Sequence, residues 1–186
     1  NNIHAKNYFQ WIHTDVKSME PPDALDKYLP SYQKMDAIFC VADSAHNSFA
    51  SMYPALGSKT YTLYNFFDAA AISKKASTPI AFSSERPILL SVGRMTPQKK
   101  YLRFLDVLAK LRDEGYAFSW HVLGTGIELD AIKQRIDELH LNERVFLDGL
   151  TDNPYQCMAA CDLFVLPSGW EGFPTVTIEA KLLRKP

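Results

Sequence analysis

From residue 88 onward, short apolar segments alternate regularly with amphipathic helical patterns. In one of these patterns the apolar side chains recur every three or four residues, which places Leu129, Ile132, Ile136 and Leu139 on one helix face. Repeated strand–helix units form a parallel sheet with helices on both faces. The alternation therefore predicts an α/β fold with a Rossmann-like sheet in the second half of the chain.

The elements predicted for the second half are strands over 88–92, 118–123, 145–147 and 163–166, helices over 99–113, 128–139 and 155–160, and a last helix containing Glu179. The first part of the chain shows the same alternation of strands and helices less completely, with strands predicted over 8–13, 37–41 and 60–64. A helical pattern over 23–36 should break at Pro30, and another helix should begin at Ser44 as N-cap and run to Tyr53. Residues 77–86 mix Ser, Thr and Pro and predict a linker between a domain over 1–76 and a domain over 87–186.

Charge and hydropathy exclude several classes of protein. The formal net charge is −1 and the sequence pI about 6.6, so nonspecific nucleic-acid binding is not expected. No apolar run reaches the length of about 18 residues that a transmembrane helix needs. The three cysteines form no zinc-binding pattern and predict small buried side chains in a reducing compartment.

Two glutamates, Glu171 and Glu179, stand eight positions apart around a Gly-Phe-Pro turn. Glu171 falls in a strand-to-helix loop, and Glu179 about two turns into the following helix, whose first turn suits Pro174. Ligands of open α/β sheets bind at the carboxyl ends of strands, and a helix start can receive an anion. Two acceptor-only carboxylates beside such a site suit a ligand with central phosphates and hydroxyls at both ends, which describes a nucleotide sugar.

The segment from Glu171 to Ala180 resembles the Glu-x7-Glu motif of the retaining family 4 (group 1) glycosyltransferases, which have the two-Rossmann-domain GT-B architecture. Three further segments resemble that family in the expected order: Ser91 to Met95 with Lys99, Leu123 to Gly126, and Cys161 to Ser168. Together they cover about residues 88–186. The resemblance implies that 87–186 is a donor-binding domain truncated at its C-terminus and 1–76 the end of the acceptor-side domain.

The resemblance also implies roles for individual residues. Arg94 and Lys99 would stabilise the donor diphosphate, and Glu171 would orient sugar hydroxyls near the reacting carbon. Glu179 would accept hydrogen bonds from the ribose, and His13 would contact the donor sugar from the acceptor-side domain. Without the motif, the glutamates would be surface carboxylates, the cations a solvated turn and His13 a structural histidine.

Backbone-dominated positions complete the predicted nucleotide-binding set: Gly172, Phe173, Thr175, Gly124 and Gly126. Leu129 stands where a dinucleotide fingerprint has its third glycine, so a nicotinamide site is not expected. Lys100 departs from the family, which often has Gly or Asn there. No Asp-x-Asp pair occurs in the chain, so we expect no metal and no cofactor besides the donor, which is expected to be a UDP-sugar.

The predicted function is transfer of a sugar, with retention, from a nucleotide sugar to a saccharide or lipid-linked acceptor in bacterial surface polysaccharide or glycolipid synthesis. A nucleotide-sugar epimerase of the same fold, or a nucleotide-binding module without chemistry, remain as alternatives. The expected location is the cytoplasm, with peripheral attachment at the inner face of the membrane left open. The chain is expected to be a fragment that self-associates through uncovered strand edges and apolar faces.

Overall fold

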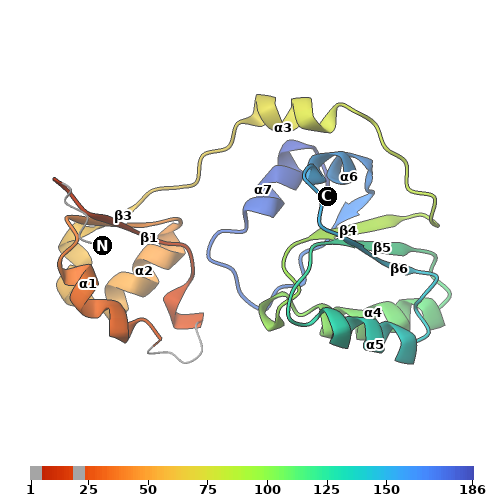
Figure 1. Cartoon of the computed structure of the whole chain (residues 1–186), viewed down its shortest axis with the longest axis horizontal. Helices are drawn as coiled ribbons and strands as arrows, with labels where there is room; N and C mark the ends of the chain where they lie inside the picture. Colours follow the sequence, from red (N-terminus) through yellow and green to blue (C-terminus); the bar gives the residue numbers. More distant parts are fainter. Residues whose placement is uncertain (1–5, 19–23) are drawn as a thin grey trace. The chain divides into compact units, whose positions relative to one another are not determined.

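The computed structural model describes residues 6–18 and 24–186, and the chain folds into two compact units. The first unit is formed by the chain up to Phe66 together with Trp170–Pro174, and the second by Phe67–Gly169 with Thr175–Pro186. Each unit has its own parallel sheet, as Figure 1 shows, so the predicted α/β class is confirmed.

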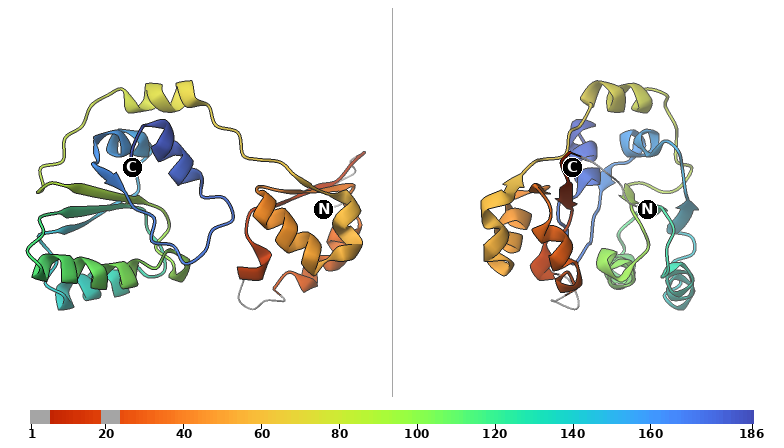
Figure 2. Two further views of the ribbon diagram at one scale, coloured as in Figure 1. Left: turned by 180° about the vertical axis from the view of Figure 1, so that it is seen from behind. Right: turned by 60° about the vertical axis from the view of Figure 1, so that its left-hand side comes forward.

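The sheet of the first unit has the order β1-β2-β3, and all its pairs are parallel. Its strands are β1 (Phe9–Ile12), β2 (Ala37–Cys40) and β3 (Thr60–Thr62). The helical segments are η1 (Val16–Ser18), η2 (Asp26–Tyr28), α1 (Leu29–Gln33), α2 (Asp43–Met52) and η3 (Pro54–Lys59). Helices α1 and α2 lie on the same side of the sheet (Figures 1 and 2), where Ile38, Cys40 and Phe49 are completely buried.

The opposite face of this sheet carries a row of aromatic side chains. Trp11, Phe39 and Tyr61 are in direct register across the three strands, and the ring centroids of Trp11 and Phe39 lie 4.8 Å apart. Phe9 extends the row, with its ring centroid 5.8 Å from that of Phe39. Phe9 and Tyr61 remain 51% and 50% exposed, although parallel sheets are ordinarily covered on both faces.

The sheet of the second unit has the order β6-β5-β4-β7 and is also parallel throughout. Its strands are β4 (Ile88–Val92), β5 (Ser119–Leu123), β6 (Val145–Gly149) and β7 (Leu163–Phe164). Its helical segments are α3 (Ala69–Ala76), η4 (Pro97–Lys99), α4 (Tyr101–Asp113), α5 (Leu129–Glu138), α6 (Pro154–Ala160) and α7 (Thr175–Leu182). Within the described part of the chain, no helix is both long and apolar enough to cross a bilayer.

Two hydrophobic layers sandwich the second sheet. On one face α4 and α5 pack around Trp120, whose ring meets Tyr101 and Phe104 edge-on at centroid distances of 5.5 and 5.0 Å. On the other face Leu90 is fully buried together with Met158 of α6, and Val176 of α7 packs against them. Figure 1 shows the two helix pairs on opposite faces of the strands. This three-layer arrangement is what the strand–helix alternation predicted.

Helix α3 changes the predicted division of the chain. The linker was predicted to begin at residue 77, but the second unit begins at Phe67, and α3 packs against α6 and α7. The helix begins because the Asp68 carboxylate accepts a hydrogen bond from the Ala71 backbone at 2.9 Å, a standard N-cap. Burial of Ile72 then fixes α3 to the rest of the second unit.

The first-unit helices differ from the predicted ones in their boundaries. Residue 23, where a helix was predicted to begin, lies outside the described residues. The helical pattern is divided near Pro30, as predicted: η2 ends at Tyr28 and α1 begins at Leu29. Pro30 stands in the first turn of α1, a position that needs no N–H donor. Helix α2 begins at Asp43 after Ala42, so Ser44 is not its N-cap.

The cysteines lie in the interior, as expected. Cys40 and Cys161 are buried, and Cys157 is half-buried; none forms a disulfide. Burial raises the pKa of the Cys40 and Cys161 thiols to about 11 and also raises the pKa of Cys157. All three thiols are therefore held in their protonated form at neutral pH.

Lys100, between η4 and α4, has a left-handed backbone with φ 54° and ψ 31°. Glycine adopts this conformation readily, whereas a residue with a Cβ pays about 1–2 kcal/mol for it. The conformation explains why Gly or Asn would be favoured at this position.

Replacing Lys100→Gly should therefore raise the free energy of unfolding by about 1 kcal/mol, because it removes the left-handed strain. The matched control is Lys110→Gly, at an exposed position within α4, which should lower it by about 1 kcal/mol. Urea unfolding followed by circular dichroism measures both. Equal destabilisation by the two glycines would show that the Lys100 turn stores no strain.

The exposed aromatic row should make the isolated chain self-associate, since contiguous apolar surface favours contact between copies. Replacing Phe9→Ser and Tyr61→Ser together should reduce the mean mass measured by light scattering at high concentration. Tyr116→Ser, at a 58% exposed tyrosine of the second unit, should leave the mass unchanged. A wild-type chain that stays monomeric at high concentration would contradict the expectation.

Candidate functional site

Several of the predicted site residues lie in loops at the carboxyl edge of the second sheet. Since β4, β5, β6 and β7 are parallel, the loops that follow them all leave at this edge. Open α/β sheets bind their ligands there. Arg94 follows β4, and Gly124 and Gly126 follow β5.

The loops after β4 and β5 lie against each other through their backbones. Met95 donates its backbone N–H to the Thr125 carbonyl at 2.9 Å, and Glu128 donates to the Met95 carbonyl at 3.0 Å. A Cβ on Gly124 would lie 2.0 Å from the Gly93 carbonyl oxygen, and one on Gly126 would lie 2.3 Å from the Met95 carbonyl oxygen. Only glycine allows this approach, so the two residues predicted to approach a nucleotide also hold the two loops together.

Two cations stand beside these loops. Arg94 is exposed, and Lys99 ends η4 with its side chain half-buried. The Lys99 Cε lies 3.2 Å from the point where a Cβ of Gly93 would stand, so the lysine stem crosses directly over that glycine. The absence of a side chain at Gly93 thus makes room for a lysine at the end of β4. Both cations can stabilise an anion at this edge.

Helix α7 carries Thr175 as its first residue and Glu179 just over one turn later. The helix is preceded by Pro174, so the Thr175 N–H stands at its N-terminal end, where backbone donors lack helical partners. The Tyr155 hydroxyl donates a hydrogen bond to Oε1 of Glu179 at 3.2 Å. Tyr155 was not predicted as a site residue, because nothing in its local pattern marks a contact with Glu179, 24 residues away.

The loop of Glu171 belongs to the first unit. A Cβ on Gly172 would lie 2.1 Å from the His13 carbonyl oxygen and 2.7 Å from the Thr14 Cα, so this glycine sits directly on the backbone after β1. Phe173 packs on the core of the first unit, with its ring centroid 6.2 Å from that of Tyr64. The structure therefore places the loop of Glu171 against the backbone of His13 through Gly172.

The backbone around His13 is fixed by a small polar network. Ser48 donates its hydroxyl to the Asp15 carboxylate at 2.5 Å, and the Lys17 backbone donates to both side chains at 3.1 Å. Val16 is 1% exposed and anchors the same segment in the core. His13 itself is exposed at the end of β1, available to a ligand.

The predicted site residues thus fall into two groups. The second unit carries Arg94, Lys99, Gly124, Gly126, Thr175 and Glu179, and the first carries His13, Glu171, Gly172 and Phe173. The chain passes from the second unit to the first after Gly169 and returns at Thr175, so the Glu-x7-Glu motif contributes one carboxylate to each unit.

A polar cluster on β5 was also not predicted. His121 Nδ1 lies 2.8 Å from Oδ2 of Asp148, and its Nε2 lies 2.8 Å from the Ser84 hydroxyl. The ring is 6% exposed, stacked on Phe146 at 4.7 Å and covered by Phe82 at 4.3 Å. The histidine is packed in the interior, and its contacts tie the segment before β4 to the sheet.

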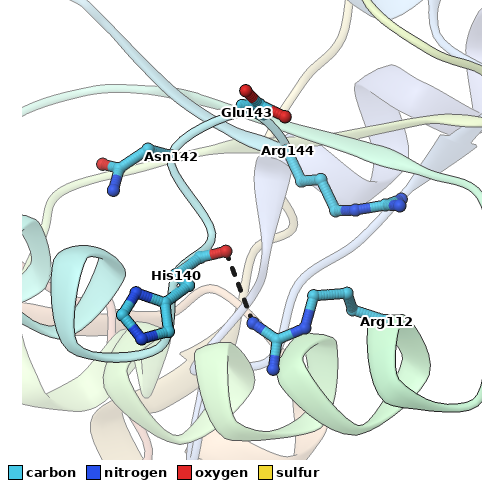
Figure 3. A pocket seen from close by; sticks show the side chains of 5 residues that line it. All are labelled: Arg112, His140, Asn142, Glu143 and Arg144. Carbon is cyan, nitrogen blue, oxygen red and sulfur yellow. Dashed lines mark hydrogen bonds between the residues drawn. The ribbon is translucent and has the colours of Figure 1, made fainter.

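The second unit has a hollow of about 450 Å³. It is lined by Arg112, His140, Asn142, Glu143 and Arg144, whose side chains Figure 3 shows. It precedes β6, at the opposite edge of the sheet from the loops described above. Its cations already have partners: Arg112 pairs with Asp113 at 2.7 Å, and Arg144 pairs with Glu85 at 3.3 Å. None of the predicted site residues lines it. Residues 6–18 and 24–186 contain no group of three or more His, Cys, Asp or Glu side chains placed to hold a metal ion.

Solved structures share this architecture. TarM of Staphylococcus aureus, in a complex that includes UDP, superposes with a TM-score of 0.78 over 96% of this chain and 35% of its own, at 21% identity. HepE of Anabaena, in complex with UDP and glucose, gives a TM-score of 0.76 over 96% of this chain and 51% of its own, also at 21% identity. The fold is therefore that of GT-B glycosyltransferases.

Curated relatives extend the similarity to sequence. A Campylobacter jejuni protein is 32% identical over 158 residues, which are 84% of this chain and 42% of that protein. It is named N-acetylgalactosamine-N,N'-diacetylbacillosaminyl-diphospho-undecaprenol 4-alpha-N-acetylgalactosaminyltransferase. The poly(ribitol-phosphate) alpha-N-acetylglucosaminyltransferase of Staphylococcus aureus is 29% identical over 126 residues, 68% of this chain and 25% of that protein. The chain spans less than half the length of these relatives.

A family model decides the assignment. The model of the glycosyl transferases group 1 matches residues 73–186, which include the whole sheet of the second unit and the Glu-x7-Glu motif. The match covers more than half of the chain and the four segments whose resemblance was noted from the sequence. The chain belongs to the group 1 glycosyl transferases.

Proposed function

We propose that this chain binds a nucleotide-sugar donor and takes part in the transfer of its sugar, with retention of configuration, to a saccharide or lipid-linked acceptor. The observation that carries the proposal is the pair Arg94 and Lys99 beside the interlocked loops after β4 and β5. Cations at the carboxyl edge of a parallel sheet suit a diphosphate.

The proposed chemistry follows from where charge develops. As the bond from the anomeric carbon to the diphosphate oxygen breaks, both electrons stay with the leaving diphosphate. Arg94 and Lys99 would stabilise that charge more in the transition state than in the ground state. The acceptor hydroxyl would bond to the anomeric carbon on the same face, and its proton would pass to the departing phosphate. Glu171 and His13 would orient the sugar.

The donor is proposed to be a UDP-sugar, bound without a metal ion or further cofactor. The TarM and HepE structures, which contain UDP, support the choice of nucleotide. The C. jejuni relative, named for a diphospho-undecaprenol acceptor, supports a lipid-linked acceptor in surface glycan synthesis. Such a role would place the protein in the cytoplasm, at the inner face of the membrane.

Binding of UDP should survive removal of divalent metals, since the two cations supply the positive charge. Isothermal titration calorimetry with chelator present measures this directly. Arg94→Met and Lys99→Met should each weaken binding roughly tenfold or more, because a lost bond to a charged group costs about 1.5–3 kcal/mol. Arg103→Met, at an exposed position in α4, is the control. Affinity that disappears with chelator and returns with Mg²⁺ or Mn²⁺ would refute metal independence.

The two glutamates should differ in effect. Glu171→Ala should lower turnover more than UDP affinity, because Glu171 is proposed to contact the sugar. Glu179→Ala should weaken UDP binding roughly tenfold, the loss expected for a charged hydrogen-bond acceptor. Turnover is measured as release of UDP from the donor by the active protein, and UDP affinity is measured by calorimetry. Glu114→Ala, at an exposed position, is the control. Unchanged kinetics and UDP affinity in both variants would show that the two glutamates are surface carboxylates. UDP binding by the wild-type protein without sugar transfer would favour a binding module.

A further inference from the structure

Tyr155 is the second residue of α6 and contacts a glutamate on the neighbouring helix α7. Its hydroxyl donates to Oε1 of Glu179 at 3.2 Å, in a partly buried position. Helices α6 and α7 pack against each other in the same unit. The contact therefore joins a side chain with no assigned role to the carboxylate proposed to bind the nucleotide.

The tyrosine is held from the side of α3. Asn153, just before α6, donates its amide Nδ2 to the Lys75 carbonyl at 2.9 Å. The Lys75 ammonium lies 5.7 Å from the centroid of the Tyr155 ring, within the range of a cation–π interaction. Since Pro154 begins α6 and α3 packs on that helix, the ring has a defined position before any ligand arrives.

In the hydrogen bond between Tyr155 and Glu179, the tyrosine hydroxyl is the donor and the carboxylate is the acceptor. Burial, followed by the charge of Glu179, raises the pKa of Tyr155 above its usual value. The hydroxyl is therefore a donor wherever the carboxylate is ionised, and the carboxylate is an acceptor only. In the described residues, the structure records a hydrogen bond to Oε1 of Glu179 but none to Oε2.

We infer that Tyr155 is a positioning residue: by holding Oε1 of Glu179, it presents Oε2 to the hydroxyls of a nucleotide ribose. The inference rests on the proposed function, in which Glu179 binds the donor nucleotide. Without the tyrosine, the glutamate side chain would have to be ordered on binding, which costs affinity. A purely structural contact between α6 and α7 is the competing interpretation.

The test removes only the hydroxyl. Tyr155→Phe, Glu179→Ala and the double variant are titrated calorimetrically with UDP and with 2′,3′-dideoxy-UDP, which lacks the ribose diol. Tyr155→Phe should weaken UDP binding about three- to tenfold, the usual range for one hydrogen bond, and leave the dideoxy nucleotide unaffected. In the Glu179→Ala background the tyrosine substitution should have no further effect, as expected for residues acting through one contact. Tyr116→Phe serves as the matched tyrosine control.

Several results would overturn the inference. Unchanged UDP affinity in Tyr155→Phe would do so. Equal weakening of binding for UDP and the dideoxy nucleotide would indicate a structural contact, and so would a tyrosine effect that is undiminished in the Glu179→Ala background. If the wild-type protein binds UDP and Tyr155→Phe binds it with the same affinity, only this inference is refuted. Wild-type protein that binds no UDP removes the proposed function together with it.

Discussion

The close approach of the loops after β4 and β5 is the constraint on which the second unit depends. Gly124 and Gly126 allow backbone contact with Gly93 and Met95 at distances where any Cβ would collide. The hydrogen bond from Met95 to Thr125 then fixes both loops at the carboxyl edge of the sheet. Because Lys99 crosses over Gly93, the position of a cation follows from the same packing. The packing of the loops and the position of a cation proposed to bind the donor thus depend on the same set of glycines.

In the first unit, too, a glycine allows two backbone segments to approach closely. Gly172 rests on the His13 carbonyl, and Phe173 enters the hydrophobic core, so a loop distant in sequence is fixed to the end of β1. The Asp15 and Ser48 pair holds the other side of that strand end. The loop that carries Glu171 is therefore positioned by backbone contact and by one partly buried ring.

The second half was predictable because its signals are local. Strand β4 was predicted at its observed bounds, and α4, α5 and α6 within about two residues, since apolar periodicity reports burial directly. Helix α3 was not predicted, although Asp68 followed by alanines is a usable N-cap signal. Contacts such as Gly172 on His13, Tyr155 on Glu179, and His121 between Ser84 and Asp148 join distant residues. No local pattern could supply them.

The protonated, buried state of the thiols has a practical consequence. Alkylating reagents attack thiolates, and Cys40, Cys157 and Cys161 are held as thiols by burial. A cysteine introduced at an exposed surface position, such as Lys34 in the first unit or Lys133 in the second, would therefore react first. Pairs of fluorescent or spin labels could be attached there with the native cysteines left in place, and each unit would then carry its own reporter.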